Sequence, residues 1–252
     1  MLFDTHAHLN DRAFDTDRDI LIAGLRDKGV GFVMNAGCDL QSSKECIALV
    51  ERYPFLYASV GSHPDAADEV CEELMETYLQ MSRHPKVKAI GEIGLDYYYE
   101  DFDRQIQLRA FQMQMELARQ AELPVIVHER DAHGDGMDVV QAFPDVNGVF
   151  HCYSGGAEMA QQLVKKGWYI GFTGVLTFKN ARKAVETAAA IPLERIVLET
   201  DCPYMSPEPY RGKRNDPGRL PYMAQKLAEI RGLPVEKIIE ITTENAKRLY
   251  RI

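Results

Sequence analysis

Short apolar segments alternate with segments of helical periodicity along the whole chain. The apolar segments are rich in β-branched residues and continuous, which is typical of parallel strands buried on both faces. They cover residues 2–3, 30–36, 55–60, 87–90, 124–127, 148–150, 169–172 and 195–198. Eight such strands separated by helices predict a (β/α)8 TIM barrel, and a doubly wound open sheet is the alternative.

The segments between the predicted strands carry apolar residues at helical spacing. The longest predicted helix covers Arg104 to Ala121 and has a wide apolar face. The first helix is expected to begin at a capping pair, Thr16 and Asp19, and to end at Gly29. Further helices are predicted at 41–52, 69–82, 134–143, 157–166, 180–190, 217–231 and 235–250. No linker or repeat interrupts this pattern, so we expect a single domain over residues 1–252.

Composition and charge narrow the class of protein. With 46% hydrophobic and 27% charged residues the chain is expected to be globular, without a membrane span or signal peptide. Because both are missing, we expect a cytoplasmic location, and the sequence shows no obligate protein partner. The cysteines are odd in number and lack metal-site spacing, so we expect reduced thiols at Cys38, Cys46, Cys71, Cys152 and Cys202. A net charge of -9 argues against a general nucleic-acid coat, although metals and a few arginines bind polyanions locally.

Histidines and carboxylates recur at the carboxyl ends of the predicted strands. In a barrel these ends meet at one face, where active sites are built. The residues at these positions are His6, His8, His63, Glu92, His128, His151 and Asp201. Such a convergence of imidazoles and carboxylates predicts a metal site. For His6 and His8 alone, the alternative is a pair of core histidines bonded to the backbone. The other two histidines, His84 and His133, are expected at the surface.

The predicted ligand set is larger than one ion needs. His6 and His8 lie two residues apart on a strand, so they point the same way with α-carbons about 6.6 Å apart. Two ions that share a bridging carboxylate would use all of these predicted ligands. Glu92 is the natural bridge because it follows a middle strand and is flanked by Gly91 and Gly94, which leave room for other groups to approach. The alternative for Glu92 is a capping or salt-bridging role.

An ordered set of motifs along nearly the whole chain resembles the TatD family of metal-dependent deoxyribonucleases, within the amidohydrolase-like barrels. The motifs are DTHAHL at 4–9, GSHP at 61–64, GEIGLDYYY at 91–99, VIVHERDA at 125–132, GVFHCYSG at 148–155 and LETDCPYMSPEPYRGKRNDP at 198–217. Singly, the His-x-His pair is a weak signal. The ordered set is highly specific.

The resemblance implies a TIM barrel that binds two divalent ions. It places one ion between His6, His8, Glu92 and Asp201 and the second between Glu92, His128 and His151. It further implies a 3′ to 5′ exonuclease on single-stranded DNA, usually assayed with magnesium, in which His63 and Arg211 lie near the substrate phosphate. The chain departs from the family at Ser62, where a leucine is common, and at Glu129, whose charge would disturb a phosphate site if it faced inward.

The same residues suggest a mechanism. A divalent ion lowers the pKa of bound water, which makes a nucleophile available at neutral pH. Asp201 is the best candidate to hold that nucleophile and take its proton, with Glu92 as its catalytic partner at the metals. Arg211, in a basic loop after the last strand, is expected to contact the scissile phosphate or its neighbour, unless the loop is only solvated. The run 97–99, three tyrosines, is expected either to stack on unpaired bases or to pack.

Two other functions stay open from the residues. The first is a barrel hydrolase of a small ester, amide or phosphoester; its carboxylated-lysine type needs a lysine where this chain has Glu92, because Lys86 and Lys88 come too early. The second is a metal-binding or nucleotide-binding protein without activity. The identity of the metal is also open, because four histidines favour zinc or manganese whereas the family's usual activator is magnesium.

Overall fold

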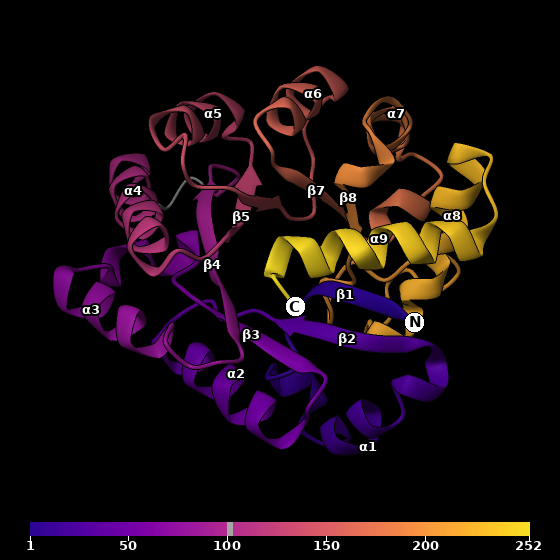
Figure 1. The fold of residues 1–252 in the computed structure, drawn as a ribbon, viewed down its shortest axis with the longest axis horizontal. Coiled ribbons are helices and arrows are strands. Elements are labelled where there is room, and N and C mark those ends of the chain that lie inside the picture. Colours follow the sequence, from indigo (N-terminus) through magenta and orange to yellow (C-terminus); the bar gives the residue numbers. More distant parts are fainter. Residues whose placement is uncertain (100–102) are drawn as a thin grey trace. The chain divides into compact units, whose positions relative to one another are not determined.

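The computed structural model describes residues 1–99 and 103–252. Eight parallel strands belong to one sheet, in which they follow the order of the sequence (Figure 1). They are β1 (Leu2–Ala7), β2 (Val30–Asn35), β3 (Leu56–Val60), β4 (Val87–Asp96), β5 (Val125–Arg130), β6 (Gly148–Phe150), β7 (Tyr169–Phe172) and β8 (Ile196–Leu198). The chain divides into two compact units, residues 1–35 with 152–252, and residues 36–151. The single domain predicted over residues 1–252 stays a prediction.

The first unit contains β1, β2, β7 and β8. A parallel bridge between Ala7 and Cys202 joins the end of β1 to the chain that leaves β8. Its helices are α1 (Arg18–Ala23), α6 (Ala157–Lys165), α7 (Arg182–Ala190), α8 (Leu220–Arg231) and α9 (Val235–Tyr250). Helix α9 packs on β1 and β8 (Figure 1). There the hydroxyl of Tyr250 donates to Thr5 O (2.9 Å) and the amide of Asn245 donates to Ile196 O (2.7 Å), so polar contacts fix the helix to both strands.

The second unit contains β3, β4, β5 and β6. Its helices are α2 (Leu40–Arg52), α3 (Glu72–Met81), α4 (Arg104–Ala121) and α5 (His133–Ala142). Helix α4 packs on β4 and beside α3 (Figure 1), with Phe111, Met115 and Ala118 fully buried. The wide apolar face predicted for this helix is therefore confirmed.

Two buried glutamines of α4 hold the carboxyl ends of β3 and β4. The side chain of Gln114 accepts from Ser62 N (2.7 Å) and donates to Ser62 O (2.9 Å). About two helical turns earlier, Gln107 accepts from Asp96 N (2.9 Å) and donates to Asp96 O (3.0 Å). Each amide thus satisfies both the N–H and the C=O group of one backbone residue, Ser62 just past β3 and Asp96 at the end of β4. These clamps fix the strand ends that carry the chemistry.

The predicted elements are largely confirmed, with differences in the first helix and at the ends of some strands. Helix α1 begins after Asp17, so the predicted cap of Thr16 with Asp19 is wrong. The carboxylate of Asp17 makes no capping bond because the guanidinium of Arg214 binds both of its oxygens, at 2.8 and 2.6 Å. The single helix predicted to run to Gly29 is also wrong, because α1 ends at Ala23 with Gly24 as its cap. Gly29, with φ 83°, ends a separate short 3-10 turn, Arg26–Lys28. Strand β4 is longer than predicted, and Glu92 lies within it.

Among the described residues, no helix has both the length and the apolar character that crossing a bilayer demands.

Gly94 lets β4 approach β5 more closely than a side chain would allow. Its φ is 142°, and a Cβ built there would lie 2.0 Å from the backbone oxygen of His128. A Cβ at Gly91 would lie 2.7 Å from Cβ of Ile126. Both glycines therefore set the close contact of the two strands on either side of Glu92, which agrees with the space expected there.

We expect Gly94→Ala to lower the free energy of unfolding by about 3 kcal/mol, because the clash is with backbone and the φ is strained for an L-residue. Denaturant unfolding of the purified protein measures this loss. Gly134→Ala is the matched control, since a Cβ at Gly134 in α5 meets nothing within 4 Å. That variant should lose no stability, and equal losses in both would contradict the explanation.

Candidate metal centre

The first unit brings His6, His8 and Asp201 together. The Nε2 atoms of His6 and His8 lie 3.0 Å apart. Oδ1 of Asp201 lies 3.4 Å from Nε2 of His8 and 3.8 Å from Nε2 of His6. All three residues are buried. Two imidazole nitrogens and one carboxylate oxygen therefore converge on one point, as expected for these three residues.

Backbone hydrogen bonds hold this cluster where β1 ends and the chain leaves β8. The amide of His8 donates to Cys202 O (2.8 Å), and the amide of Asp201 donates to His6 O (2.9 Å). Asp201 has a φ of 53°, in the left-handed region that a non-glycine residue seldom adopts. Such strain is maintained only where surrounding contacts fix it, and it is frequent at functional sites.

Asp4 supports the cluster from the interior. It is fully buried, its Oδ1 accepts from Thr200 N (2.8 Å) and its Oδ2 accepts from the Thr200 hydroxyl (2.5 Å). Burial outweighs these hydrogen bonds and raises the pKa of Asp4 from 3.8 to about 8. The side chain is therefore protonated at neutral pH, and it links β1 to the residue just before Asp201.

The second unit gathers its residues around the carboxylate of Glu92. Oε1 of Glu92 lies 2.7 Å from Nε2 of His151 and 2.9 Å from Nδ1 of His128. These two nitrogens are 3.2 Å apart. His63 is adjacent, with Nε2 3.7 Å from Oε1 of Glu92 and its ring 4.3 Å from that of His128. Four predicted site residues thus form one group.

Asp96 is a member of this group that sequence reasoning missed. Its Oδ2 lies 3.1 Å from Nε2 of His128, on the ring edge opposite Glu92. Burial lowers the pKa of His128, but hydrogen bonds to Asp96 and Glu92 outweigh it and raise that pKa to about 10. The signal was present in the sequence, because Glu92, Gly94 and Asp96 alternate along β4 and so share one face.

Cys38 was assigned only as a reduced thiol, and it also lies at this group. Its Sγ donates to Oε2 of Glu92 at 3.7 Å. The backbone amide of Cys38 donates to the hydroxyl of Ser42 at the start of α2, which fixes the thiol's position. A thiol beside the carboxylate adds a soft donor to the imidazoles. No sequence spacing pointed to this role, since the cysteines share no common motif.

Arg211 lies in the loop after β8, where its guanidinium carbon is 4.2 Å from the ring centre of Phe178. Its contact with a substrate phosphate stays a prediction. Two other cations of the same loop are bound within the protein: Arg214 pairs with Asp17, and Arg219 donates to the hydroxyl of Ser206 (2.9 Å). The exposed Arg211 is thus the better candidate for an external anion.

The two departures from the family motifs are explained within the second unit. The hydroxyl of Ser62 bonds to the hydroxyl of Tyr78 on α3 (2.9 Å). The carboxylate of Glu129 accepts from Ala132 N (2.8 Å) and bonds to Nδ1 of His133 (2.5 Å). Glu129 also alternates with His128 along β5, so it faces away from the Glu92 group. Its charge is compensated at the start of α5.

Lys86 is not available as a bridging carboxylated lysine. Its ammonium group donates to Val50 O and Tyr53 O, both at 2.8 Å. These carbonyls lie at the amino end of β3, whereas Glu92 lies toward the carboxyl end of β4. The glutamate-type centre is therefore the one that these residues fit.

The donor sets fit divalent cations. Each cluster offers two imidazole nitrogens and one carboxylate oxygen: His6, His8 and Asp201 in the first unit, and Glu92, His128 and His151 in the second. Mixed nitrogen and oxygen donors of this kind suit zinc, manganese and similar ions. The buried carboxylates would also gain a compensating charge. His128 would bind through Nδ1, because its Nε2 is directed at Asp96.

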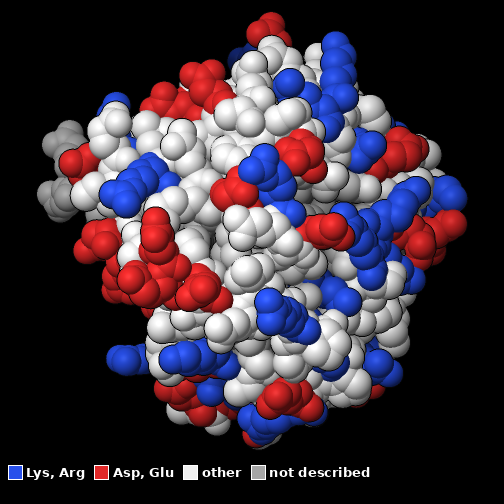
Figure 2. All heavy atoms as spheres, turned by 60° about the vertical axis from the view of Figure 1, so that its left-hand side comes forward, with Lys and Arg blue, Asp and Glu red and all other residues white. Residues whose placement is uncertain are grey.

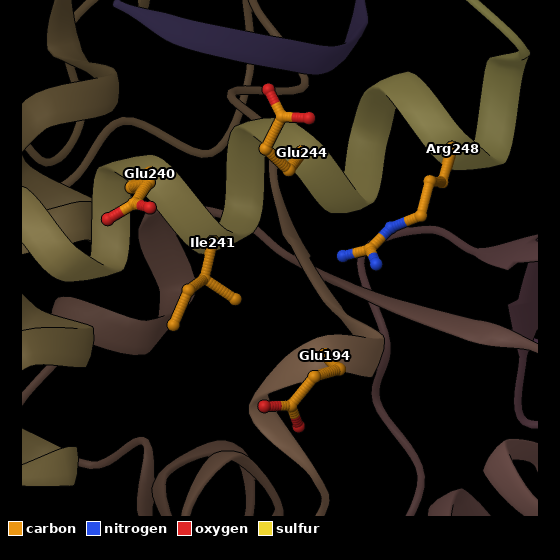
Figure 3. Close-up of a pocket in the computed structure, with 5 residues that line it drawn as sticks. All are labelled: Glu194, Glu240, Ile241, Glu244 and Arg248. Atoms are coloured by element: carbon orange, nitrogen blue, oxygen red, sulfur yellow. The ribbon is translucent and has the colours of Figure 1, made fainter.

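Two surface hollows lie elsewhere. One, of about 310 Å³, is lined by residues of α9 and of the turn that precedes β8, at the amino end of that strand (Figure 3): Glu194, Glu240, Ile241, Glu244 and Arg248. The other, of about 690 Å³, lies between α3 and α4 and includes Glu72, Glu73, Glu76 and Glu116. Acidic side chains also gather on the left of the face drawn in Figure 2. Carboxylates repel a phosphate backbone, so neither hollow suits a nucleic acid.

Comparison with known proteins identifies relatives over the whole length. Residues 3–251 match the family model described as TatD related DNase. A Bacillus subtilis protein named as a metal-dependent hydrolase, YabD, is 42% identical over 254 residues, and the alignment covers 100% of both chains. A Salmonella typhimurium protein named 3′-5′ ssDNA/RNA exonuclease TatD is 30% identical over 258 residues, covering 100% of this chain and 99% of that protein.

The fold is similar to that of a solved relative. The crystal structure of YjjV, a TatD homologue from Escherichia coli, superposes with a TM-score of 0.94 and 30% identity, over 100% of this chain and 98% of that chain. With the strand order, this likeness confirms the predicted (β/α)8 TIM barrel class.

We expect Asp96→Asn to weaken binding of a divalent ion by about 10- to 100-fold, because outer partners of a ligating histidine set its orientation and basicity. Isothermal titration of metal-free protein with Mn²⁺ or Zn²⁺ measures the change. Asp135→Asn is the control, since Asp135 is bonded to the Tyr97 hydroxyl and not to a cluster residue. Unchanged affinity in Asp96→Asn would remove Asp96 from the metal centre.

The raised pKa of Asp4 predicts a pH-dependent stability of the metal-free protein. Between about pH 4 and pH 8 the folded state keeps a proton that the unfolded state has lost, so stability falls as pH rises. One full proton corresponds to about 1.4 kcal/mol per pH unit. Asp4→Asn cannot titrate and should lack this slope. Urea unfolding of both proteins across the window measures the difference, and parallel curves would contradict the assignment.

Proposed function

The chain belongs to the TatD-related DNase family of metal-dependent hydrolases, and we propose that it is a 3′ to 5′ exonuclease that hydrolyses phosphodiester bonds of single-stranded DNA. The observation that carries the proposal is the pair of ligand clusters, each with two imidazoles and a carboxylate, at the carboxyl ends of the strands. The name of the Salmonella relative supports the substrate class. Hydrolysis of phosphodiesters by metal-activated water suits this chemistry.

Two divalent ions are proposed as cofactors, one for each cluster. His6, His8 and Asp201 would hold one ion, and Glu92, His128 and His151 would hold the other; magnesium, manganese and zinc are the candidates. Bound ions of this kind lower the pKa of a coordinated water and neutralise phosphate oxygens. The bridging role predicted for Glu92 stays part of the proposal.

In this mechanism the protein's own groups orient the reactants and move protons. The carboxylate of Asp201, held at a fixed φ by its bond to His6 O, would accept the proton of the attacking water and return it to the leaving 3′ oxygen. Glu92, held between two imidazoles, would complete the catalytic pair. His63 and Arg211 would bind the substrate phosphate, the arginine through its planar pair of donors.

A cytoplasmic location is proposed with this function. No disulfide joins the five cysteines, all of which lie in the described part of the chain, and this suits a reducing compartment. Single-stranded DNA is the proposed partner, without an obligate protein partner.

The test is to strip the protein with a chelator and to restore Mg²⁺, Mn²⁺ or Zn²⁺ one at a time. A 5′-labelled single-stranded oligodeoxynucleotide should then be shortened from its 3′ end in single-nucleotide steps. An oligoribonucleotide of the same length, assayed in parallel, gives the rate on RNA for comparison with the rate on DNA. Glu92→Ala should lose at least about a hundredfold of the rate, because a buried charged group of the centre is removed.

Three outcomes would contradict this proposal. Laddering that persists in Glu92→Ala would identify a contaminant. No laddering with any ion would exclude the nuclease. Hydrolysis confined to a small ester or phosphoester would assign the same centre to the alternative substrate class.

A further inference from the structure

Tyr98 and Tyr99 leave two aromatic rings in solvent just past the end of β4. Tyr98 is 56% exposed and Tyr99 is 50% exposed. Their rings are perpendicular, with centres 5.0 Å apart. Tyr97 is different: its hydroxyl donates to Asp135 (2.7 Å) and the guanidinium of Arg104 lies over its ring. The packing explanation thus accounts for Tyr97 and leaves the next two tyrosines to be explained.

Arg130, the last residue of β5, joins the two exposed rings. Its guanidinium carbon lies 3.6 Å from the ring centre of Tyr98 and 5.6 Å from that of Tyr99. The amide of Tyr97 donates to Arg130 O (2.9 Å), which fixes the arginine's backbone beside the tyrosines. A planar cation stacked on an aromatic ring presents both a flat surface and a positive charge. These are the two features that unpaired nucleotides need.

This aromatic group is tied directly to the Glu92 cluster. Asp96 accepts from Tyr98 N through Oδ1 (2.9 Å), and its Oδ2 bonds to Nε2 of His128 (3.1 Å). Arg130 lies two residues after His128 on β5, so both point to the same face with α-carbons about 6.6 Å apart. One carboxylate therefore positions a predicted metal ligand and the first exposed tyrosine together.

We propose that Tyr98, Tyr99 and Arg130 form a stacking surface for the unpaired bases of a single-stranded nucleic acid whose backbone lies at the Glu92 cluster. This inference rests on the proposed nuclease function and adds the residues that would bind the unpaired bases of its substrate. A base-paired nucleotide already stacks on its neighbours, so this surface favours single strands. Base stacking on an aromatic side chain contributes about 1–3 kcal/mol per base and is tolerant of sequence.

The test measures binding, so that it does not depend on turnover. The metal-loaded protein is titrated into a fluorescein-labelled oligothymidylate with phosphorothioate linkages, which resist hydrolysis, and into an abasic strand of the same length. Fluorescence anisotropy gives both dissociation constants. We expect Tyr98→Ala to weaken binding of the base-bearing strand by about tenfold and to leave the abasic strand nearly unchanged. Tyr98→Phe keeps the ring and should bind like the wild type.

Arg52→Ala is the matched control, because Arg52 stacks on Tyr53 at 5.3 Å before β3, at the opposite end of the strands. It should bind both strands like the wild type. Equal binding of the base-bearing strand by Tyr98→Ala and the wild type would overturn the inference, as would an equal loss for the abasic strand. If the oligonucleotide is shortened stepwise but Tyr98→Ala binds like the wild type, only the proposed stacking surface is overturned. If Tyr98→Ala weakens binding but no oligonucleotide is shortened, only the proposed nuclease activity is overturned.

Discussion

The buried carboxylate of Glu92 is the group on which the second unit depends. A charge out of water is costly unless other groups compensate it, and here two imidazole nitrogens lie within 2.9 Å of one carboxylate oxygen while a thiol approaches the other. Much of the surrounding structure serves this arrangement. Gly94 brings β5 close enough for His128 to reach Glu92, and Asp96 fixes the far edge of the His128 ring.

The first unit also holds a buried carboxylate beside two imidazoles, but different contacts position it. Its carboxylate, Asp201, follows a short strand and takes a left-handed backbone conformation, while the two histidines come from one strand through simple alternation. Asp4 beneath them is protonated, so it adds hydrogen bonds without adding charge. One unit therefore compensates a buried charge with imidazoles, and the other avoids a second buried charge by raising a pKa.

Most of the fold, and which candidate site residues lie together, could be predicted from the sequence because both follow from local pattern. Continuous apolar segments gave the strands, and the strand ends gave His6, His8, His63, Glu92, His128, His151 and Asp201. What could not be predicted depends on contacts distant in sequence. The predicted cap at Thr16 was wrong because the helix begins one residue later, after Asp17, and the carboxylate of Asp17 is bound by Arg214, almost two hundred residues away. Cys38 has no motif, and the outward direction of Glu129 depends on the start of α5.

The glutamine clamps on α4 have a consequence for how the site tolerates its surroundings. An amide carries no net charge, so the bonds of Gln107 and Gln114 to the strand ends do not titrate and are little screened by salt. Acidification or a change of ionic strength can alter the imidazoles and carboxylates without loosening the backbone beneath them. We therefore expect the backbone at the ends of β3 and β4 to keep its position when a cation binds to the neighbouring side chains or leaves them.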